Sequence, residues 1–451
     1  MAWGRGDFEA LTNLSATRGL ADFENFQRRF LGPAETSLAT TPFATPRGRV
    51  GMASRTVSRS VFRRLRCVGS HQSTSSWSSV PTPATYGTPA SFETPEADAV
   101  SASSDRIVVE SVANQLKTQG YAVVDGALDG LVDTGETNKP KETLAETLRR
   151  ELMTLTSTPG VMVPNATVLV SKDGSQSKLE KASIMEAEMH NLDEEILSTV
   201  PALRAVAENR STLTLLNVMI PSTSNNQLHH QVVKLQKNTG DGGCFPLHFD
   251  ADALVDGRKI TQLTYLNPEW KPGDGGELIL YPFPMDKPIV IEPIMGRTVL
   301  FAAQHMLHRV APSNANERLC FTTWFFAKNG GNGMDGDKAE DSDKSDNNSS
   351  DNTSSDTPYS PVAWQQAREL CKPHLRKHLQ KAVFAEQWAA SILESHPPSP
   401  VRDLVLATHQ EEVETIMRAL AGKFPEGIQL IAHVAENGTR KEKDRMGVRW
   451  L

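Results

Sequence analysis

The sequence predicts an α+β protein in which an antiparallel sandwich or barrel of short strands lies between helical segments. Between residues 212 and 326, β-branched and aromatic runs alternate with Gly, Pro and Asn turns. Apolar residues recur at helical spacing before this region and again after residue 360. Two further stretches, 1–104 and 329–360, have compositions that do not build a core, and we expect them to be disordered.

Composition limits the class of protein. At 451 residues the chain can hold two ordinary domains, or one larger domain with appendages. The net charge of −7 gives no reason to expect nucleic-acid affinity, and no continuous apolar stretch is long enough to predict a membrane-spanning helix. The cysteines are scattered and form no CxxC pair, which favours an intracellular protein without a disulfide framework.

The N-terminal region, 1–104, is rich in Ser, Thr, Pro and Arg and has no acidic residue between Thr36 and Phe92. From Met52 onward it has the Arg-rich, Ser-rich and acid-poor composition of an organelle transit peptide. The alternative is an ordinary disordered basic tail. We therefore expect a cytoplasmic protein, or a mitochondrial or plastid protein if the segment from Met52 directs import.

Ordered structure is expected from Asp105, with one domain spanning 105–328. The stretch "RIVVESVANQLKTQGYAVVDGAL" (106–128) predicts a helix followed by a strand, and "ETLAETLRRELMTL" (142–155) predicts a second helix. We expect "TLTLLNVMI" (212–220) to open the series of strands that ends with "FTTWFF" (321–326).

Residues 329–360 form an acidic, low-complexity linker, and residues 361–451 are expected to be a separate helical module that either recruits a partner or caps the barrel. Ser399-Pro400 resembles a helix start. His374 and His378 have the i, i+4 spacing that can hold a metal. No carboxylate completes such a site, so a solvated helix face is the better interpretation.

The motif with chemical content is His248-Phe249-Asp250. Residues i and i+2 of a strand point to the same side, so His248 and Asp250 can bind one ion together. A second histidine on a neighbouring strand would complete two imidazoles and one carboxylate, the set that leaves open positions on Fe(II) for an oxygenase. His305 and His308 are the downstream candidates, and the residues alone do not choose between them.

Two other strands place polar side chains inside the predicted barrel. Alternation aligns the inward residues Thr261, Leu263 and Tyr265 on one strand, and Arg318, Cys320, Thr322 and Trp324 on another. A guanidinium with two hydroxyls suits a bound dicarboxylate. The alternative for Arg318 is a surface residue at a strand start, but its place ten residues after a candidate metal ligand favours the functional interpretation.

The stretch from about 230 to 326 resembles the 2-oxoglutarate/Fe(II) dioxygenase domain of the prolyl 4-hydroxylase superfamily. The closer likeness is to hypoxia-inducible-factor prolyl hydroxylases and their bacterial relatives. The matching pieces, in order, are "HFD", "LTYLNPEW", "GDGGELILY", "GRTVLFAAQHMLHRVAP" and "ERLCFTTWFF". With the opening helix and strand, the resemblance covers 105–327, and it implies a double-stranded β-helix (jelly-roll) core with flanking helices.

The resemblance also implies roles for individual residues. The family's distal ligand is followed by a variable residue, Val and often Pro, which fits His308 and leaves His305 as a neighbour. Fe(II) would then bind His248, Asp250 and His308. The family's anchor for the far carboxylate of 2-oxoglutarate falls on Arg318. The co-substrate tyrosine and threonine fall on Tyr265 and Thr261, and the strand-end tryptophan of the pocket falls on Trp324.

The activity implied by the resemblance is hydroxylation of peptidyl proline at C4 in a protein substrate. 2-Oxoglutarate and O2 would be consumed, succinate and CO2 released, and ascorbate required. One departure concerns the substrate: hypoxia-type enzymes have a tyrosine before the HxD motif, whereas this chain has "KNTGDGGCF", which puts Asn238 or a neighbour there. The "GDGG" stretch (273–276) is interpreted either as a mobile lid or as a simple turn.

Several alternatives remain beside this prediction. The same oxygenase chemistry could act on a small molecule, a lipid or a nucleic-acid base. The lack of a second Arg soon after Arg318 and of basic stripes around the core argues against a nucleic-acid substrate. A non-catalytic binding protein could keep the barrel, and a cupin-type isomerase or storage barrel shares the fold class but does not need Arg318.

Overall fold

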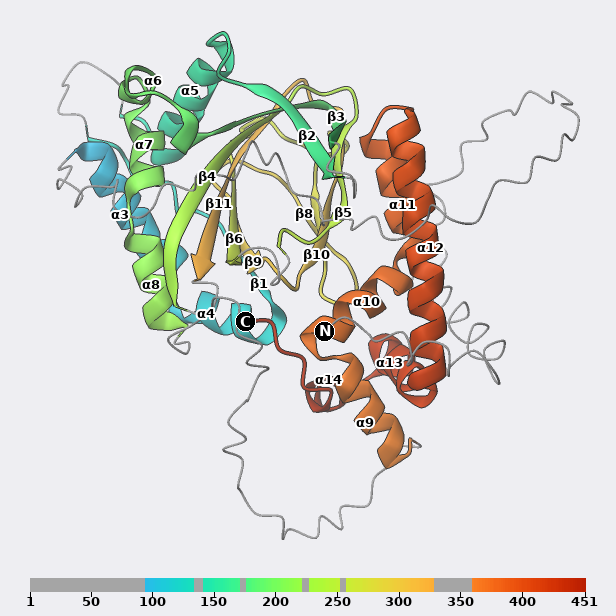
Figure 1. The fold of residues 1–451 in the computed structure, drawn as a ribbon. Helices are drawn as coiled ribbons and strands as arrows, with labels where there is room; N and C mark the ends of the chain where they lie inside the picture. Colours follow the sequence, from blue (N-terminus) through green and yellow to red (C-terminus); the bar gives the residue numbers. More distant parts are fainter. Residues whose placement is uncertain (1–93, 134–140, 171–175, 221–226, 252–256, 328–358) are drawn as a thin grey trace, which may run out of the picture.

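The computed structural model describes residues 94–133, 141–170, 176–220, 227–251, 257–327 and 359–451. Two β-sheets lie at the centre, with one group of helices beside the larger sheet and the C-terminal helices beside the smaller sheet (Figure 1). The predicted transit segment from Met52, the rest of 1–93, and 329–358 of the predicted linker lie outside the described residues. No helix in the described ranges is both long enough and apolar enough to cross a membrane.

Both sheets are antiparallel throughout. The seven-stranded sheet has the order β1-β9-β6-β11-β4-β3-β2. Its strands, in that order, are Tyr121–Val124, Thr298–Ala302, Arg258–Tyr265, Arg318–Ala327, Leu228–Asn238, Gln176–Glu188 and Val163–Val170. The four-stranded sheet has the order β5-β10-β7-β8. Its strands are Gly243–His248, Leu307–Ser313, Leu278–Tyr281 and Ile289–Ile291.

The two sheets face each other across an apolar core. Phe245, Leu278 and Val310 of the smaller sheet pack with residues of the larger sheet that include Leu263 and Phe301. Such packing follows from the period-2 alternation of each strand, which sends every second side chain inward. The predicted jelly-roll core with flanking helices is confirmed.

The first group of helices covers the outer face of the larger sheet (Figure 1). It consists of α3 (Pro95–Ile107), α4 (Glu110–Gln119), α5 (Leu144–Ser157), the short 3₁₀ helix η3 (Met189–Asn191), α6 (Glu194–Ser198), α7 (Pro201–Glu208) and α8 (Ser211–Met219). The predicted helix and strand at 106–128, and the predicted helix at 142–155, agree with α4, β1 and α5.

Two expectations about this group were wrong. Ordered structure begins before Asp105, because Thr94 caps α3 by accepting a hydrogen bond from the backbone N–H of Ala97, with Pro95 in the first turn. The expected strand at 212–220 is helix α8. Its buried residues Leu213 and Leu216 are three positions apart and face the sheet, a contact that outweighs the β propensity of a short apolar run.

The C-terminal module consists of α9 (Pro361–Leu370), α10 (Pro373–Val383), α11 (Ala385–Ser395), α12 (Pro400–Lys423), α13 (Pro425–Asn437) and α14 (Arg440–Arg445). Ser399 caps α12 as its sequence predicts. The module shares a core with the smaller sheet. The ring of Phe384 lies 4.9 Å from that of Tyr281 and 5.8 Å from that of Phe283.

Candidate active site

Three residues meet at one end of the space between the sheets. His248 ends β5, Asp250 follows just beyond, and His308 lies directly opposite His248 on the neighbouring strand β10. One ligand atom from each lies within 4.8 Å of the others. The Nε2 atoms of His248 and His308 lie 3.5 and 3.6 Å from Oδ1 of Asp250. The structure therefore brings together the two imidazoles and the carboxylate that the sequence singled out.

The other candidate histidines are not part of this group. His305 precedes β10 and is not among the residues whose ligand atoms converge there. His374 and His378 lie on α10, and within the described ranges they form no metal-binding group with a third ligand. His308 is thus the histidine that the fold places opposite His248.

Backbone carbonyls fix the orientation of both imidazole rings. Nδ1 of His248 lies 2.7 Å from the carbonyl oxygen of Pro246, and Nδ1 of His308 lies 3.0 Å from that of Met306. A carbonyl oxygen only accepts, so each Nδ1 must carry the proton and donate. The lone pair of each ring is then on Nε2, which points toward Asp250, the arrangement usual for metal-binding histidines.

The charges at this end suit a divalent cation. Burial by itself raises the pKa of Asp250, but the two histidines and the hydroxyl of Thr261 outweigh it and hold that pKa below its ordinary value. Burial, with His248 nearby, lowers the pKa of His308 to about 4. At neutral pH, Asp250 is therefore ionised and His308 is neutral, the protonation states that metal binding requires.

The second oxygen of Asp250 is held by the protein. Oδ2 accepts a hydrogen bond of 2.5 Å from the hydroxyl of Thr261 and one of 3.3 Å from Nε1 of Trp324. Thr261 and Trp324 were expected to contact the co-substrate and the substrate. Both line the cavity described below, but their polar atoms are directed at Asp250 because the two residues are cross-strand partners on β6 and β11.

Arg318 lies at the other end of the same space and is 3% exposed. Its Nε donates to the carbonyl oxygen of Gly276 at 2.8 Å, and its Nη1 lies 3.4 Å from Sγ of Cys320. Nη2 is buried and has no hydrogen-bond partner among the described residues. The guanidinium is thus held at one side and has an unused donor at the other.

Tyr265 lies beside this unused donor. The guanidinium of Arg318 is 5.1 Å from the centre of the tyrosine ring, and the buried hydroxyl of Tyr265 has no hydrogen-bond partner among the described residues. Burial raises the pKa of this hydroxyl, although Arg318 opposes that shift, so it stays protonated and can donate. The unused buried donor of Arg318 fits a carboxylate. Tyr265 contacts Arg318 but is not among the residues that line the cavity described below.

The "GDGG" stretch is a turn against Arg318. Gly276 has a φ of +75°, and a Cβ atom there would come within 2.6 Å of Cδ of Arg318. Glycine is therefore required both by the backbone conformation and by the close approach of the arginine.

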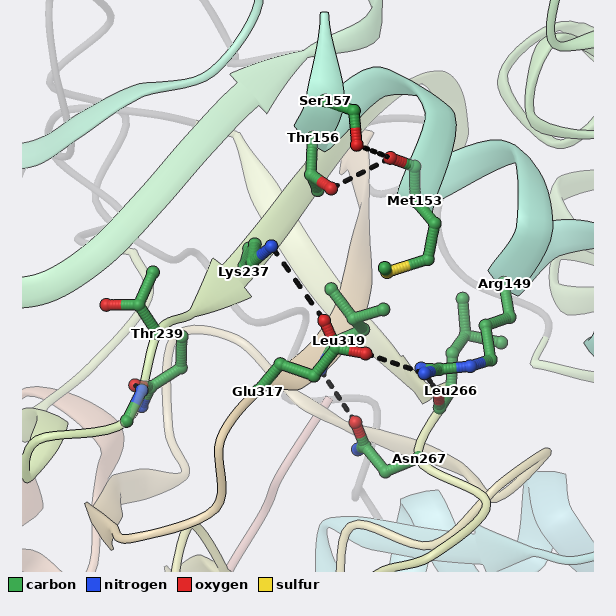
Figure 2. Close-up of polar contacts among 12 residues, drawn as sticks. Arg149, Met153, Thr156, Ser157, Lys237, Thr239, Leu266, Asn267, Glu317 and Leu319 are labelled. Atoms are coloured by element: carbon green, nitrogen blue, oxygen red, sulfur yellow. Dashed lines mark hydrogen bonds and ion pairs between the residues drawn. The ribbon is translucent and has the colours of Figure 1, made fainter.

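Figure 2 shows the contacts of Glu317 and Leu319, the two residues on either side of Arg318 at the start of β11. Glu317 accepts a hydrogen bond of 2.6 Å from Arg149 of α5 and lies 3.8 Å from Nζ of Lys237. The side-chain oxygen of Asn267 accepts from the backbone N–H of Leu319 at 2.7 Å. The residues on both sides of Arg318 are therefore held by Arg149 of α5, Lys237 of β4 and Asn267, which follows β6.

A cavity of about 400 Å³, including its mouth, joins the two ends. Its apolar wall is built by inward residues of both sheets, and sequence reasoning missed most of them: Phe245, Leu278, Phe301 and Val310, together with the polar Gln236. Strand alternation could have identified them as inward residues, but not as neighbours of one cavity.

Asn238, expected near the substrate pocket, is not among the residues that line this cavity. Its Nδ2 donates to the carbonyl oxygen of Gly243 at 2.6 Å, and its Oδ1 accepts from the backbone N–H of Gly240 at 3.0 Å. Asn238 thus closes the turn between β4 and β5, a common use of asparagine side chains.

The chain was also compared with known protein families and structures. Residues 230–326 match the model of the 2OG-Fe(II) oxygenase superfamily. A prolyl 4-hydroxylase from Phytophthora capsici is 26% identical, with 76% of this chain and 96% of that chain covered and a TM-score of 0.49. A Trichoplax adhaerens prolyl hydroxylase, solved with a hypoxia inducible factor peptide, is 23% identical over 51% of this chain and 91% of that chain, with a TM-score of 0.38.

Proposed function

We propose that this chain, a 2-oxoglutarate-dependent dioxygenase whose residues 230–326 form a 2OG-Fe(II) oxygenase domain, hydroxylates peptidyl proline at C4. The observation that carries the proposal is a cavity with two chemically different ends. One end has His248, Asp250 and His308, and the other has Arg318 with an unused buried donor. A short dicarboxylate that must also reach a metal needs both ends.

Each residue has a defined task in this proposal. The Nε2 atoms of His248 and His308 and Oδ1 of Asp250 would hold Fe(II). Nη2 of Arg318 and the hydroxyl of Tyr265 would bind the far carboxylate of 2-oxoglutarate. When bound, the iron would supply the place where O2 is reduced: one oxygen atom would oxidise 2-oxoglutarate to succinate with release of CO2, and the other would be inserted into the C4–H bond of proline. We also propose a dependence on ascorbate.

The protein substrate is the finer part of the proposal. Two features support it: the residues shared with prolyl hydroxylases, and a cavity walled by Phe245, Leu278, Phe301 and Val310. Such a wall excludes water and offers no charged partner, which suits a neutral, largely apolar ring such as proline. Arg318 and Asp250, the charged residues at its two ends, would be engaged by the co-substrate and the metal.

The test uses the full-length protein, because the C-terminal module is packed on the barrel. Succinate formed from 2-oxoglutarate is measured under Fe(II) and ascorbate, with proline-containing peptides and with matched peptides that carry Ala instead of Pro. The proposal expects stimulation by the proline peptides alone, a mass increase of one oxygen on proline, and loss of both in His308→Ala.

Two other outcomes would contradict parts of the proposal. Iron-dependent succinate formation that no peptide stimulates would overturn the proline substrate and favour a small molecule or lipid. Absence of Fe(II) binding by the unmodified protein would overturn the dioxygenase assignment and favour a binding protein.

A further inference from the structure

We propose that the C-terminal helical module is a brace that holds the metal-binding residues in place. The inference rests on the proposed function, because it treats His248, Asp250 and His308 as iron ligands. Figure 1 shows α10 and α11 beside the smaller sheet, on the side where β5 lies. The module contacts the residues on both sides of every one of the three proposed ligands.

The first contact holds the strand before His248. β5 is an edge strand, and its unpaired side is covered by α11. The hydroxyl oxygen of Ser391 accepts a hydrogen bond of 2.9 Å from the backbone N–H of Leu247. Leu247 is 1% exposed, so without Ser391 this N–H would be buried and unsatisfied. The module thereby replaces the missing neighbouring strand next to a ligand.

The second contact holds both neighbours of Asp250. Nζ of Lys377, on α10, donates to the carbonyl oxygen of Ala251 at 3.0 Å. The same Nζ lies 5.2 Å from the centre of the Phe249 ring. That ring also contacts Trp388 of the module, with 6.3 Å between ring centres. A charged donor on the carbonyl and a cation on the ring fix the backbone just before and just after Asp250.

The third contact holds both neighbours of His308. Leu307 is fully buried in the core that the module shares with the smaller sheet. Arg309 forms an ion pair of 2.6 Å with Glu394 of α11. Because alternate residues of a strand point to opposite faces, Leu307 and Arg309 face the module while His308 faces the cavity.

The alternation explains why one module can control the whole site. The outward residues are held by helices and the inward residues bind the metal, so any movement of the module is transmitted to the ligands through the strand backbone. Supports of this kind usually change metal affinity by about 10- to 100-fold when they are removed. Lys377 and Ser391 are therefore positioning residues, since neither lines the cavity.

The test measures Fe(II) affinity of the full-length protein by anaerobic titration, without substrate. Lys377→Met keeps the aliphatic stem on Phe249 and removes the hydrogen bond to Ala251, so we expect the Kd for Fe(II) to rise roughly tenfold. The matched control is Lys372→Met, in the same module, where the lysine pairs with Glu369 at the surface and should leave the Kd unchanged. A wild-type Kd in folded Lys377→Met would overturn the brace.

Ser391→Ala provides a second measurement that does not depend on metal. We expect faster hydrogen exchange at the Leu247 amide, while amides in the larger sheet keep their protection. Unchanged exchange at Leu247 would contradict the inference even if Lys377→Met failed to fold. Absence of Fe(II) binding by the unmodified protein would instead overturn the proposed function, so the two failures are distinguishable.

Discussion

The hydroxyl of Thr261 lies 2.5 Å from Oδ2 of Asp250, so one oxygen of this carboxylate is already bound to the protein. The indole N–H of Trp324 shares that oxygen at 3.3 Å. Only Oδ1 faces His248 and His308. The site is therefore built for coordination through a single carboxylate oxygen, with its orientation fixed before any metal binds.

The first prediction concerns this hydrogen bond. Thr261→Val keeps the shape of the side chain and removes the donor, so Asp250 gains rotational freedom and we expect the Kd for Fe(II) to rise roughly tenfold. The matched control is Thr264→Val on the same strand, where the hydroxyl contacts Thr298 instead. Anaerobic metal titration of both variants provides the measurement. Equal effects in the two variants would mean that the change is one of strand stability.

The second prediction separates the two ends of the cavity. Arg318→Gln removes the positive charge of the guanidinium together with its unused buried donor, Nη2. The affinity for 2-oxoglutarate should then fall by about one to two orders of magnitude, as for a lost charged hydrogen bond. Fe(II) affinity should be unchanged. The 2-oxoglutarate affinity of Arg318→Lys should lie between those of the unmodified protein and Arg318→Gln, because lysine keeps the charge but loses the paired N–H donors of the guanidinium. Equilibrium binding of each ligand tests this, and a parallel loss of Fe(II) affinity would contradict it.

The third prediction concerns Arg149, whose contact with Glu317, the residue before Arg318, is drawn in Figure 2. Arg149 donates to Glu317 and to the carbonyl oxygen of Leu266. Arg149→Met should lower the free energy of unfolding by about 1–2 kcal/mol and weaken 2-oxoglutarate binding several-fold. The control is Arg150→Met at the adjacent position. Arg150 forms an exposed ion pair with Glu142, so its loss should lower the free energy of unfolding by about 0.5 kcal/mol or less. Denaturant unfolding and ligand titration of both variants provide the comparison.

The fourth prediction is a pH dependence of stability. Burial raises the pKa of Glu151 to about 7, although the backbone N–H groups of Leu203 and Ala202 oppose the shift. Between the ordinary carboxyl pKa and pH 7, the folded state therefore binds more protons than the unfolded state. The free energy of unfolding should fall as pH rises through this window, by about 3 kcal/mol at most, and level off above it.

Glu151→Gln tests this directly, because the amide does not titrate. The variant should lose the part of the pH slope between pH 5 and 7 that Glu151 contributes, whatever its stability at a single pH. Urea unfolding at several pH values gives the slope. A slope identical to that of the unmodified protein would show that Glu151 titrates at its ordinary pKa in the folded state.

The sequence predicted some elements of the fold and failed at others for identifiable reasons. Helix α5 has regular helical spacing and a capping box between Thr143 and Glu146, so local signals sufficed. The stretch 212–220 is a short apolar run that fits a strand as well as a helix, and contacts of Leu213 and Leu216 with the sheet decide for the helix. The distance of Asn238 along the chain from His248 does not reveal that its side chain closes the turn between β4 and β5.

The sequence by itself indicated the candidate chemistry of the site, namely His248, Asp250, a downstream histidine and Arg318, and the family resemblance favoured His308 over His305. It could do so because strand alternation and motif spacing are local properties of the chain. Only the tertiary structure decided what surrounds these residues. The pairing of Thr261 with Trp324 directs both donors at Asp250, and the packing of α10 and α11 places Lys377 and Ser391 behind the ligands. Register and packing join residues far apart in the chain, and no local pattern encodes which of them will meet.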